Sequence, residues 1–449
     1  MAATWAGSAR AQIGSPPDPT LLTTTLTPLG AERAGNADGS IPAWTGGNVT
    51  APALANQPID VPIFADEHAL YSVDASNMAQ YANLLTPGTQ KLMTESGLKI
   101  NVFPTHRTAA APQYVYDNTA KNVTRAQFDP SGMRFGVVGA YAGPPFPIIN
   151  TSDPNIGGSQ LVWNHLHRWQ TFVNFTKLSG GYVVINDKVI LSFGGSSHFI
   201  CPYYATAGTA ETYGGYLSKL HEYFLLPSSS NGQEDLVWVS SNVNRYPNIT
   251  WTLLNGQGRV RKAPDEAYDT PGSVSNGLSN YDDASGFAGS PQEYDWKYIE
   301  KREMLVPYHC NAIAFTTAAD LIHPKFPNPD VIRWEKHRVW VVEATLHPGS
   351  KNTTARRRLY IDEDTWMVLL SDMYDANDAL VKTAAVYNRS IGSVPCTWEI
   401  GEIIFNFTSG GDYSFVGSLK VPGYDNNEYL VPSSPGTFIA QDMAAQASF

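Results

Sequence analysis

Residues 331–388 constrain the fold of this chain more than any other stretch, because they contain four strand-like runs separated by three short turns. The turns fall at residues 347–350, 362–365 and 375–378, between runs rich in Val, Leu, Tyr and Trp. Aromatic and β-branched runs bounded by Gly, Pro, Asn and Asp are typical of antiparallel strands. This stretch therefore predicts a four-stranded antiparallel meander in a β-rich protein.

The first strand of that meander has an unusual face. Side chains alternate along a strand with a period of two. One face is therefore expected to carry Trp334, Lys336, Arg338, Trp340, Val342 and Leu346. A plain core face would omit the cations, and a plain solvent face would omit the tryptophans. The pattern leaves two interpretations open: the indoles line a surface that holds an amphipathic ligand, or they form core beneath packed helices.

Composition excludes several classes of protein. Hydrophobic residues make up 43% of the 449 residues and charged residues only 16%, which indicates a folded globular chain with a large core. The formal net charge of −11 disfavours nucleic acid as a partner. The basic runs at residues 259–262 and 356–358 are expected to guard solvated strand edges. No run of about 18 apolar residues occurs, so the sequence predicts no transmembrane helix.

The N-terminus and the cysteines bear on location. Ala9, Arg10 and Ala11 precede Gln12 in the small-x-small pattern of a signal-peptidase site. Residues 1–25 are therefore interpreted as a signal-peptide remnant with a flexible lead-in, and the protein is expected to be exported. Cys201, Cys310 and Cys396 form no CxxC motif, and their odd number allows one disulfide at most without indicating which.

The rest of the chain is expected to form one domain, residues 26–449, which begins with an extended strap rich in Gly and Pro. Helices are expected near residues 78–85 and 87–96, where Thr86 and Pro87 provide an N-cap and a first-turn proline. A further helix is expected over residues 160–172, whereas 101–149 are expected to be loops and short strands. Strands are expected from residue 181 onward, with residues 211–226 ambiguous between helix and strand.

Searches for chemical motifs give little. The sequence has no G-x-S-x-G elbow, Walker A loop, complete dinucleotide fingerprint or HExxH motif. His165 and His167 lie two residues apart on a predicted helix, where they point in different directions and cannot share one metal ion. His165 is instead expected to pack on the inner face of this helix and bond to a backbone carbonyl. The sequence indicates no metal site, no cofactor and no catalytic constellation.

A long polar loop, residues 264–292, carries the adjacent carboxylates Asp282 and Asp283 after Tyr281. Loops of this length in compact domains are usually functional or disordered. Adjacent acids in such a loop are most often turn formers and helix caps, which is the favoured interpretation. If the loop folds over the sheet, either acid would be able to pair with Arg259 or Arg261.

Several long segments resemble one bacterial family. They are LTPLGAERAGNADGSIPAWTGG (26–47), NVFPTHRTAAAPQYVYDNTAKN (101–122), WNHLHRW (163–169), GRVRKAPDEAYDTP with SNGLSNYDD (258–283), NPDVIRWEKHRVWVVEATL (328–346) and YIDEDTW (360–366). In this order and spacing they resemble the domain-of-unknown-function family 1329, often described as outer-membrane lipoprotein-sorting proteins, over about residues 26–425.

The resemblance implies a fold class and a role. The family is similar to the LolA/LolB-like fold, an α+β but mainly β architecture in which a large curved antiparallel sheet forms an open half-barrel with helices on its concave face. LolA-like proteins carry acyl chains across the periplasm. The resemblance therefore implies a periplasmic protein that works with an envelope exporter or an outer-membrane protein, and it allows an association with the outer membrane.

These observations combine into one leading hypothesis, a periplasmic carrier or chaperone for a lipid-like cargo. The alternatives are a hydrolase that acts on a hydrophobic substrate, or a structural subunit of an export complex. Enzymatic activity is not indicated. The candidate ligand-binding residues are Trp334, Trp340, Arg338, Arg259, Arg261, Tyr281, Asp282, Asp283, His165 and Trp169.

Overall fold

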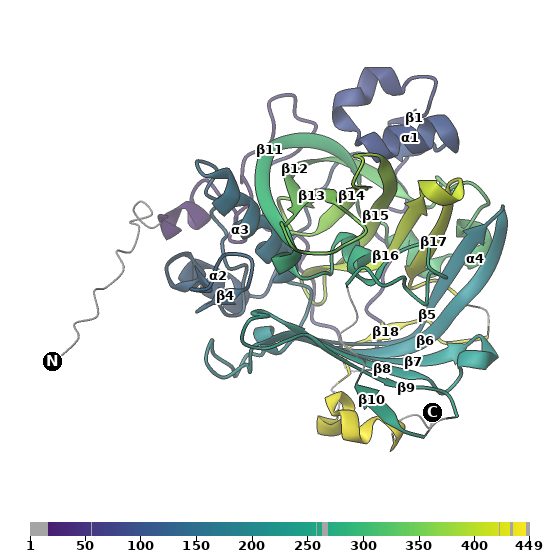
Figure 1. Ribbon diagram of the computed structural model, residues 1–449. Coiled ribbons are helices and arrows are strands. Elements are labelled where there is room, and N and C mark those ends of the chain that lie inside the picture. Colours follow the sequence, from purple (N-terminus) through teal and green to yellow (C-terminus); the bar gives the residue numbers. More distant parts are fainter. Residues whose placement is uncertain are drawn as a thin grey trace.

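The computed structural model describes residues 17–54, 56–256, 258–262, 268–421, 423–431 and 434–445. Its main feature is one 16-stranded sheet that curves around much of the molecule (Figure 1). The hydrogen-bonded path runs β1-β2-β12-β13-β14-β15-β16-β17-β5-β6-β7-β8-β9-β10, while β11 pairs with β12 and β18 with β5. The two ends of the path, β1 and β10, are not paired with each other in the described part of the chain. The predicted fold class, mainly β with a large and open sheet, is confirmed.

The strand bounds are β1 Tyr71–Val73, β2 Ile100–Val102, β3 Gln127–Phe128, β4 Val137–Val138, β5 Val173–Ile185, β6 Lys188–Ile200, β7 Tyr216–Leu226, β8 Glu234–Ser240, β9 Ile249–Leu253, β10 Val260–Lys262, β11 Tyr294–Pro307, β12 Arg333–Leu346, β13 Arg356–Asp362, β14 Val368–Tyr374, β15 Leu380–Ile391, β16 Cys396–Asn406, β17 Asp412–Gly417 and β18 Glu428–Tyr429. The large sheet is antiparallel except where β12 runs parallel to β2. β3 and β4 form a separate pair.

The predicted meander is present as β12, β13, β14 and β15, each antiparallel to the next. All three predicted turns connect them. Residues 211–226, which were ambiguous, contain strand β7. The same spacing of Tyr and Phe suits both structures, and hydrogen bonding to β6 and β8 decides for the strand.

The helices differ more from expectation. The α-helices are α1 Pro87–Glu95, α2 Gln113–Arg125, α3 Pro154–Leu166 and α4 Ala318–Leu321. The 3-10 helices are η1 Pro19–Thr23, η2 Met78–Leu84, η3 Pro202–Tyr204, η4 Ser228–Ser230, η5 Tyr281–Gly286, η6 Pro291–Glu293, η7 Asn311–Phe315, η8 Phe407–Ser409, η9 Pro435–Phe438 and η10 Ala440–Ala445. Helix α1 has the predicted cap, since Thr86 accepts a hydrogen bond from the backbone N–H of Thr89.

Helix α2 was not predicted, because residues 101–149 were expected to lack helices. Its first turn contains two tyrosines and a valine, which have modest helix propensity. Its buried side chains Val115, Thr119 and Asn122 recur at helical spacing. Tertiary packing of that stripe therefore outweighs the weak local preference.

Helix α3 starts and ends earlier than the predicted 160–172. Asp153 caps it by accepting from the N–H groups of Asn155 and Ile156. The following Gly157 and Gly158 are poor helix formers, which hid this start in the sequence. They are needed because α3 crosses β11 closely: a Cβ at position 158 would lie 2.5 Å from the backbone nitrogen of Lys297.

The mixed face of β12 does not remain one surface. Trp334 packs in a core cluster with α1, β2 and β14–β17, whereas Trp340 packs in a second cluster with α2, α3 and β11. The period-two expectation fails here because a strand of 14 residues twists along its length. Moreover, Trp334 pairs with β2 and β11, and pairing of β12 with β13 begins only at Val339.

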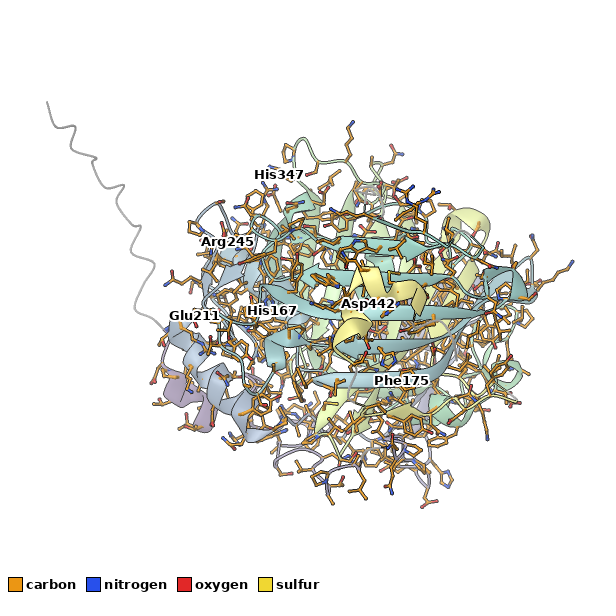
Figure 2. The ribbon with its side chains drawn as sticks, turned by 90° about the horizontal axis from the view of Figure 1, so that it is seen from below. His167, Phe175, Glu211, Arg245, His347 and Asp442 are labelled. Carbon is orange, nitrogen blue, oxygen red and sulfur yellow. The ribbon has the colours of Figure 1, made fainter. Side chains whose placement is uncertain are left out.

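Long irregular segments cover the second cluster. The described part of the 264–292 loop, from residue 268, places η5 against β14, β15 and β16, and residues 263–267 lie outside the described residues. The N-terminal strap runs along the same region, where Trp366 donates its indole N–H to the carbonyl of Leu29. At the other end of the sheet, the C-terminal segment that carries Asp442 lies across the strands (Figure 2). Residues 1–16 of the predicted lead-in also lie outside the described residues.

The structure bears on a possible disulfide and on membrane-spanning helices among the described residues. Cys201, Cys310 and Cys396 are all buried and all free, so the single disulfide that the sequence allowed is not formed. Among the described residues, no helix has both the length and the apolar character that a membrane crossing requires.

Candidate functional site

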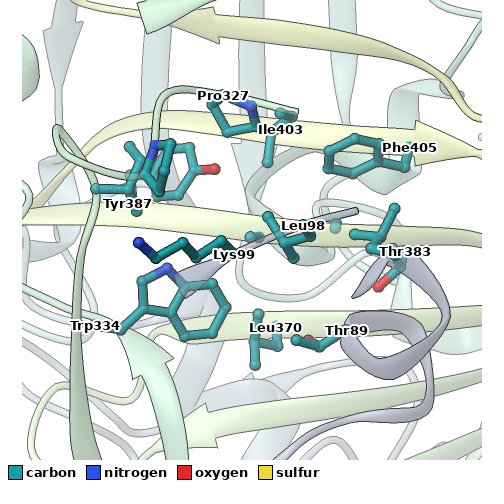
Figure 3. Close-up of a pocket in the computed structure, with 15 residues that line it drawn as sticks. Thr89, Leu98, Lys99, Pro327, Trp334, Leu370, Thr383, Tyr387, Ile403 and Phe405 are labelled. Carbon is teal, nitrogen blue, oxygen red and sulfur yellow. The ribbon is translucent and has the colours of Figure 1, made fainter. Parts of the chain in front are cut away.

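A small apolar cavity lies between α1 and the sheet (Figure 3). Its walls come from α1, from the segment after it, from the loop before β12 and from β12, β14, β15 and β16. The lining residues are Thr89, Leu92, Leu98, Lys99, Pro327, Pro329, Ile332, Trp334, Leu370, Thr383, Ala384, Ala385, Tyr387, Ile403 and Phe405. The cavity measures about 30 Å³, which is room for one or two water molecules.

A larger open groove adjoins this cavity. It measures about 640 Å³ and is lined by Asp74, Ala75, Ser76, Gly97, Lys99, His323, Phe326, Asn328, Pro329 and Asp330. Lys99 and Pro329 line both spaces. An apolar interior therefore adjoins an open groove whose lining contains two carboxylates, one ammonium group and one imidazole.

Helix α1 covers the cavity and is anchored at its N-terminus. The backbone N–H of Gly88 donates to Oδ2 of Asp372 on β14, at 3.3 Å. A Cβ at position 88 would lie 2.1 Å from Oγ1 of Thr383 and 2.2 Å from Oδ1 of Asp372, so only glycine fits. The first turn of α1 thus rests directly on two polar side chains of the sheet.

Asp372 is a fully buried carboxyl on this otherwise apolar surface. Its Oδ1 accepts from Thr383 at 2.8 Å, and its Oδ2 accepts from Tyr360 at 3.3 Å. Burial raises the pKa of Asp372 to about 6, because these hydrogen bonds offset only part of the desolvation of the charged form. The anchor of α1 is therefore a carboxyl group that titrates close to neutral pH.

Of the predicted binding residues, only Trp334 lines this cavity. Trp340 lies in the second core cluster, stacked on Trp366 and below the ammonium of Lys301. Arg338 donates to Glu363 at 3.0 Å and to the carbonyl of Ala34 in the strap. It is therefore engaged with the strap, on the Trp340 side of β12.

The loop carboxylates face the same second cluster. Asp282 and Asp283 are buried and pair with Arg357 of β13, at 2.6 and 2.8 Å. Asp283 also pairs with Lys382 of β15 at 2.7 Å. Burial would raise the pKa of Asp283, but these two cations outweigh it and hold that pKa below its ordinary value.

The possible partners Arg259 and Arg261 are not the ones that Asp282 and Asp283 use. Both arginines are exposed near β10, the last strand of the path, whereas Arg357 lies on the meander beneath the loop. The favoured interpretation as helix cap is confirmed for Asp283, whose carboxylate accepts from the N–H of Asn280 at 2.8 Å. Neighbouring Tyr281 is 47% exposed.

His165 and Trp169 are buried in the second cluster. His165 bonds to backbone groups, with Nε2 3.0 Å from the carbonyl oxygen of Phe287 and Nδ1 accepting from the N–H of Val368. This confirms the expected backbone role for His165. Trp169 donates its indole N–H to the carbonyl of Pro395 at 2.8 Å.

Sequence reasoning missed the cover and the floor of the cavity. The cap at Thr86 and Pro87 predicted α1 itself, but nothing in the sequence places that helix over Leu370, Ala385 and Ile403, which come from three later strands. The one local indication that α1 approaches another element closely was Gly88. A glycine in the first turn of a capped helix is unfavourable unless something requires a close approach there.

Comparisons with known proteins identify the family. Residues 72–428 match the model of the family described as Protein of unknown function (DUF1329). Uncharacterized protein PA3922 of Pseudomonas aeruginosa is 32% identical over 403 residues, which cover 87% of this chain and 85% of that protein.

Solved structures show weaker likenesses. A DUF1329 family protein from Desulfovibrio piger has a TM-score of 0.45 at 15% identity and covers 65% of this chain and 99% of its own. A putative outer membrane lipoprotein-sorting protein domain from Vibrio parahaemolyticus has a TM-score of 0.41 at 11% identity, over 60% and 91%. LolA superfamily protein NE2245 from Nitrosomonas europaea has a TM-score of 0.34 at 12% identity, over 62% and 94%. The family match and the relative from Pseudomonas aeruginosa establish that this chain belongs to the DUF1329 family.

Proposed function

We propose that this protein is a carrier for a lipid-like molecule, and that the hydrocarbon part of the cargo enters the space beneath α1. The observation that supports this proposal is the apolar cavity of Figure 3, which is closed by one short helix and adjoins an open polar groove. Apolar pockets with a few polar groups at one side are typical of sites for small hydrophobic ligands.

The cavity is too small to hold cargo while α1 is in place. Each buried methylene of an acyl chain contributes roughly 0.8 kcal/mol, so useful affinity needs room for many of them. That room is created if α1 moves away from Leu370, Ala385 and Ile403. Helix α1 is suited to this, because it has nine residues and is anchored at its N-terminus by one backbone hydrogen bond to Asp372.

The groove is the natural place for the polar end of the cargo. Lys99 is exposed, lies between the apolar cavity and the groove, and is well placed to meet an anionic head group. Asp74 and Asp330 line the same groove and would repel a second negative charge. The proposed cargo is therefore an amphiphile with a single anionic or neutral head group.

The proposed location is the periplasm, and the proposed recipients or donors are an envelope exporter or an outer-membrane protein. The pattern at residues 9–12 supports export. Fractionation of cells that express the full chain tests this part separately, and a purely cytoplasmic distribution would contradict it.

The main experiment measures binding of a fluorescent fatty acid to the full chain. Ala385 is half-buried in the cavity wall, so Ala385→Trp fills the space and is expected to weaken binding at least about tenfold, which equals the loss of about two well-buried methylenes. The matched control is Ala355→Trp, at a half-buried alanine just before β13 that does not line the cavity. Equal affinity of wild type and Ala385→Trp, or no saturable binding at all, would contradict the carrier proposal.

A further inference from the structure

A second cluster of polar side chains lies away from the cavity, where β12 and the end of β13 approach each other. His337 comes from β12, Asp362 ends β13, and Asp364 lies in the turn to β14. One ligand atom from each of the three lies within 4.8 Å of the other two. Their exposed fractions are 1%, 0% and 2%, so this is an interior cluster.

Each of the three side chains is held by outer partners. Nε2 of His337 lies 3.1 Å from Oε2 of Glu335, which orients the ring so that Nδ1 faces Asp362. Oδ2 of Asp362 accepts from the hydroxyl of Tyr308 at 3.0 Å and from the hydroxyl of Thr365 at 2.7 Å. Metal-binding histidines and carboxylates are usually fixed by outer hydrogen bonds of this kind.

The outer partner of Asp364 is a cation. Arg107 donates to both of its oxygens, from Nε at 2.9 Å and from a terminal nitrogen at 2.6 Å. Two oxygens of a carboxylate together offer about four acceptor positions, so both retain capacity for another partner. Arg107 also donates to the carbonyl of Glu32 at 2.7 Å, which links the cluster to the N-terminal strap.

The other oxygen of Asp362 is the unusual atom. Oδ1 is buried and makes no hydrogen bond. Its basic neighbour is Nδ1 of His337 at 4.0 Å, and no Lys or Arg of the described residues lies within 4.0 Å of the Asp362 carboxylate. A buried carboxylate oxygen without a hydrogen bond carries a desolvation cost, which a bound ion or a proton at that oxygen would offset.

We propose that His337, Asp362 and Asp364 bind one divalent transition-metal ion of the Zn²⁺ type. An imidazole nitrogen together with carboxylate oxygens suits such an ion, whereas Mg²⁺ and Ca²⁺ prefer oxygen ligands alone. Two ligands of a tetrahedral zinc ion at bond lengths of ~2.1 Å lie ~3.4 Å apart. The separation of 4.0 Å between His337 and Asp362 therefore has to contract by roughly half an ångström. The ion would fasten β12 to the turn after β13 and, through Arg107, to the strap.

The test uses the full chain without an affinity tag, freed of metal by a chelator and then titrated with Zn²⁺ in a calorimeter. We expect one tight site per chain and a rise in melting temperature on binding. Asp362→Asn keeps the shape of the side chain but removes the anionic ligand, and it is expected to weaken Zn²⁺ binding at least about tenfold. The matched control, Asp372→Asn, alters another fully buried carboxyl on the next strand and is expected to bind Zn²⁺ like wild type.

Cobalt provides a second measurement that does not depend on the stability of any variant. Co²⁺ bound to wild type is expected to show the absorption bands of a four- or five-coordinate ion, and Zn²⁺ is expected to abolish them. A spectrum of hydrated Co²⁺ only, no stoichiometric Zn²⁺ binding by wild type, or equal binding by wild type and Asp362→Asn would overturn the proposal. In that case a proton shared by His337 and Asp362 neutralises the pair.

Discussion

The two faces of the meander β12–β15 differ in what covers them. On one face, Leu370, Ala385 and other apolar side chains lie beneath the nine-residue helix α1. On the other face, Arg357 and Lys382 are buried beneath η5 and bind two carboxylates. Because side chains alternate along a strand, these two sets lie on opposite faces of the same strands.

The covers η5 and α1 therefore differ in how easily each is able to move. Removing η5 would expose an apolar surface and also leave buried charges without partners, which is costly. Removing α1 breaks one backbone hydrogen bond to Asp372 and exposes apolar surface that a hydrocarbon chain is able to cover again.

Breaking the polar face should damage the whole protein. Arg357→Leu leaves Asp282 and Asp283 without their shared cation, and we expect a loss of ~3–5 kcal/mol in the free energy of unfolding. Chemical denaturation of the purified variant measures this loss. The control is Arg356→Leu on the same strand, whose partly exposed ion pair with Asp378 is worth at most ~1 kcal/mol. Similar stability of the two variants would show that the polar face is not the fixed one.

Breaking the α1 anchor should have a smaller and local effect. Gly88→Val places side-chain atoms where Thr383 and Asp372 now lie, and we expect a loss of ~1–3 kcal/mol in the free energy of unfolding. Hydrogen exchange should speed up over residues 87–95 while the amides of β12–β15 remain protected. Thr94→Ala, on the exposed side of α1, is the control and should leave exchange almost unchanged. Faster exchange throughout the sheet would mean that α1 is not an independent cover.

The two tryptophans of β12 allow a direct test of the cavity wall against the second cluster, because they are the same residue type on the same strand. Trp334→Phe alters the cavity wall and is expected to change fatty-acid affinity about threefold to tenfold, whereas Trp340→Phe changes the second cluster and leaves affinity within about twofold. Fluorescence titration of both variants measures the difference. An equal change in both would place the ligand elsewhere.

Proton binding at Asp372 should control the opening of α1. Burial beneath α1 raises the pKa of Asp372 to about 6, whereas the carboxyl group regains a pKa of about 4 when α1 has moved and water reaches it. The closed form therefore has its full advantage below about pH 4 and loses it as the pH rises from about 4 through 6, because in that range the carboxyl group keeps its proton only while α1 is closed. Between about pH 4 and pH 7 we expect the opening of α1, measured by hydrogen exchange corrected for intrinsic rates, to rise by at least about tenfold and then to level off. The same profile in Asp372→Asn, which cannot ionise there, would exclude Asp372 as the cause.

The smallest effect is expected far from both faces. Arg259 and Arg261 are exposed near the last strand of the sheet path, so replacing both with alanine should change fatty-acid affinity by less than about twofold and stability by less than ~0.5 kcal/mol. A large loss of affinity would restore them as head-group residues.

Local patterns predicted much of the strand content. The turns of the meander, the strand-like runs and the cap of α1 depend on residues close together in the sequence, and all of them are present. Helix α2 and the early start of α3 were missed, because their local preferences are weak and contacts with distant elements stabilise them. The candidate site was largely missed, since of the ten proposed residues only Trp334 lines the cavity.

The mainly β class, the meander and the family follow from the sequence alone, because periodicity, turns and long motifs depend on residues that are close together in the chain. Only the tertiary structure decided which side chains meet. Trp334 and Trp340 are six positions apart and should share a face, yet the twist of β12 and the different partners along it send them into separate clusters. In the same way, Asp282 and Asp283 find Arg357 across a distance that no local rule specifies, because burial of a charge selects whichever opposite charge the fold brings within reach.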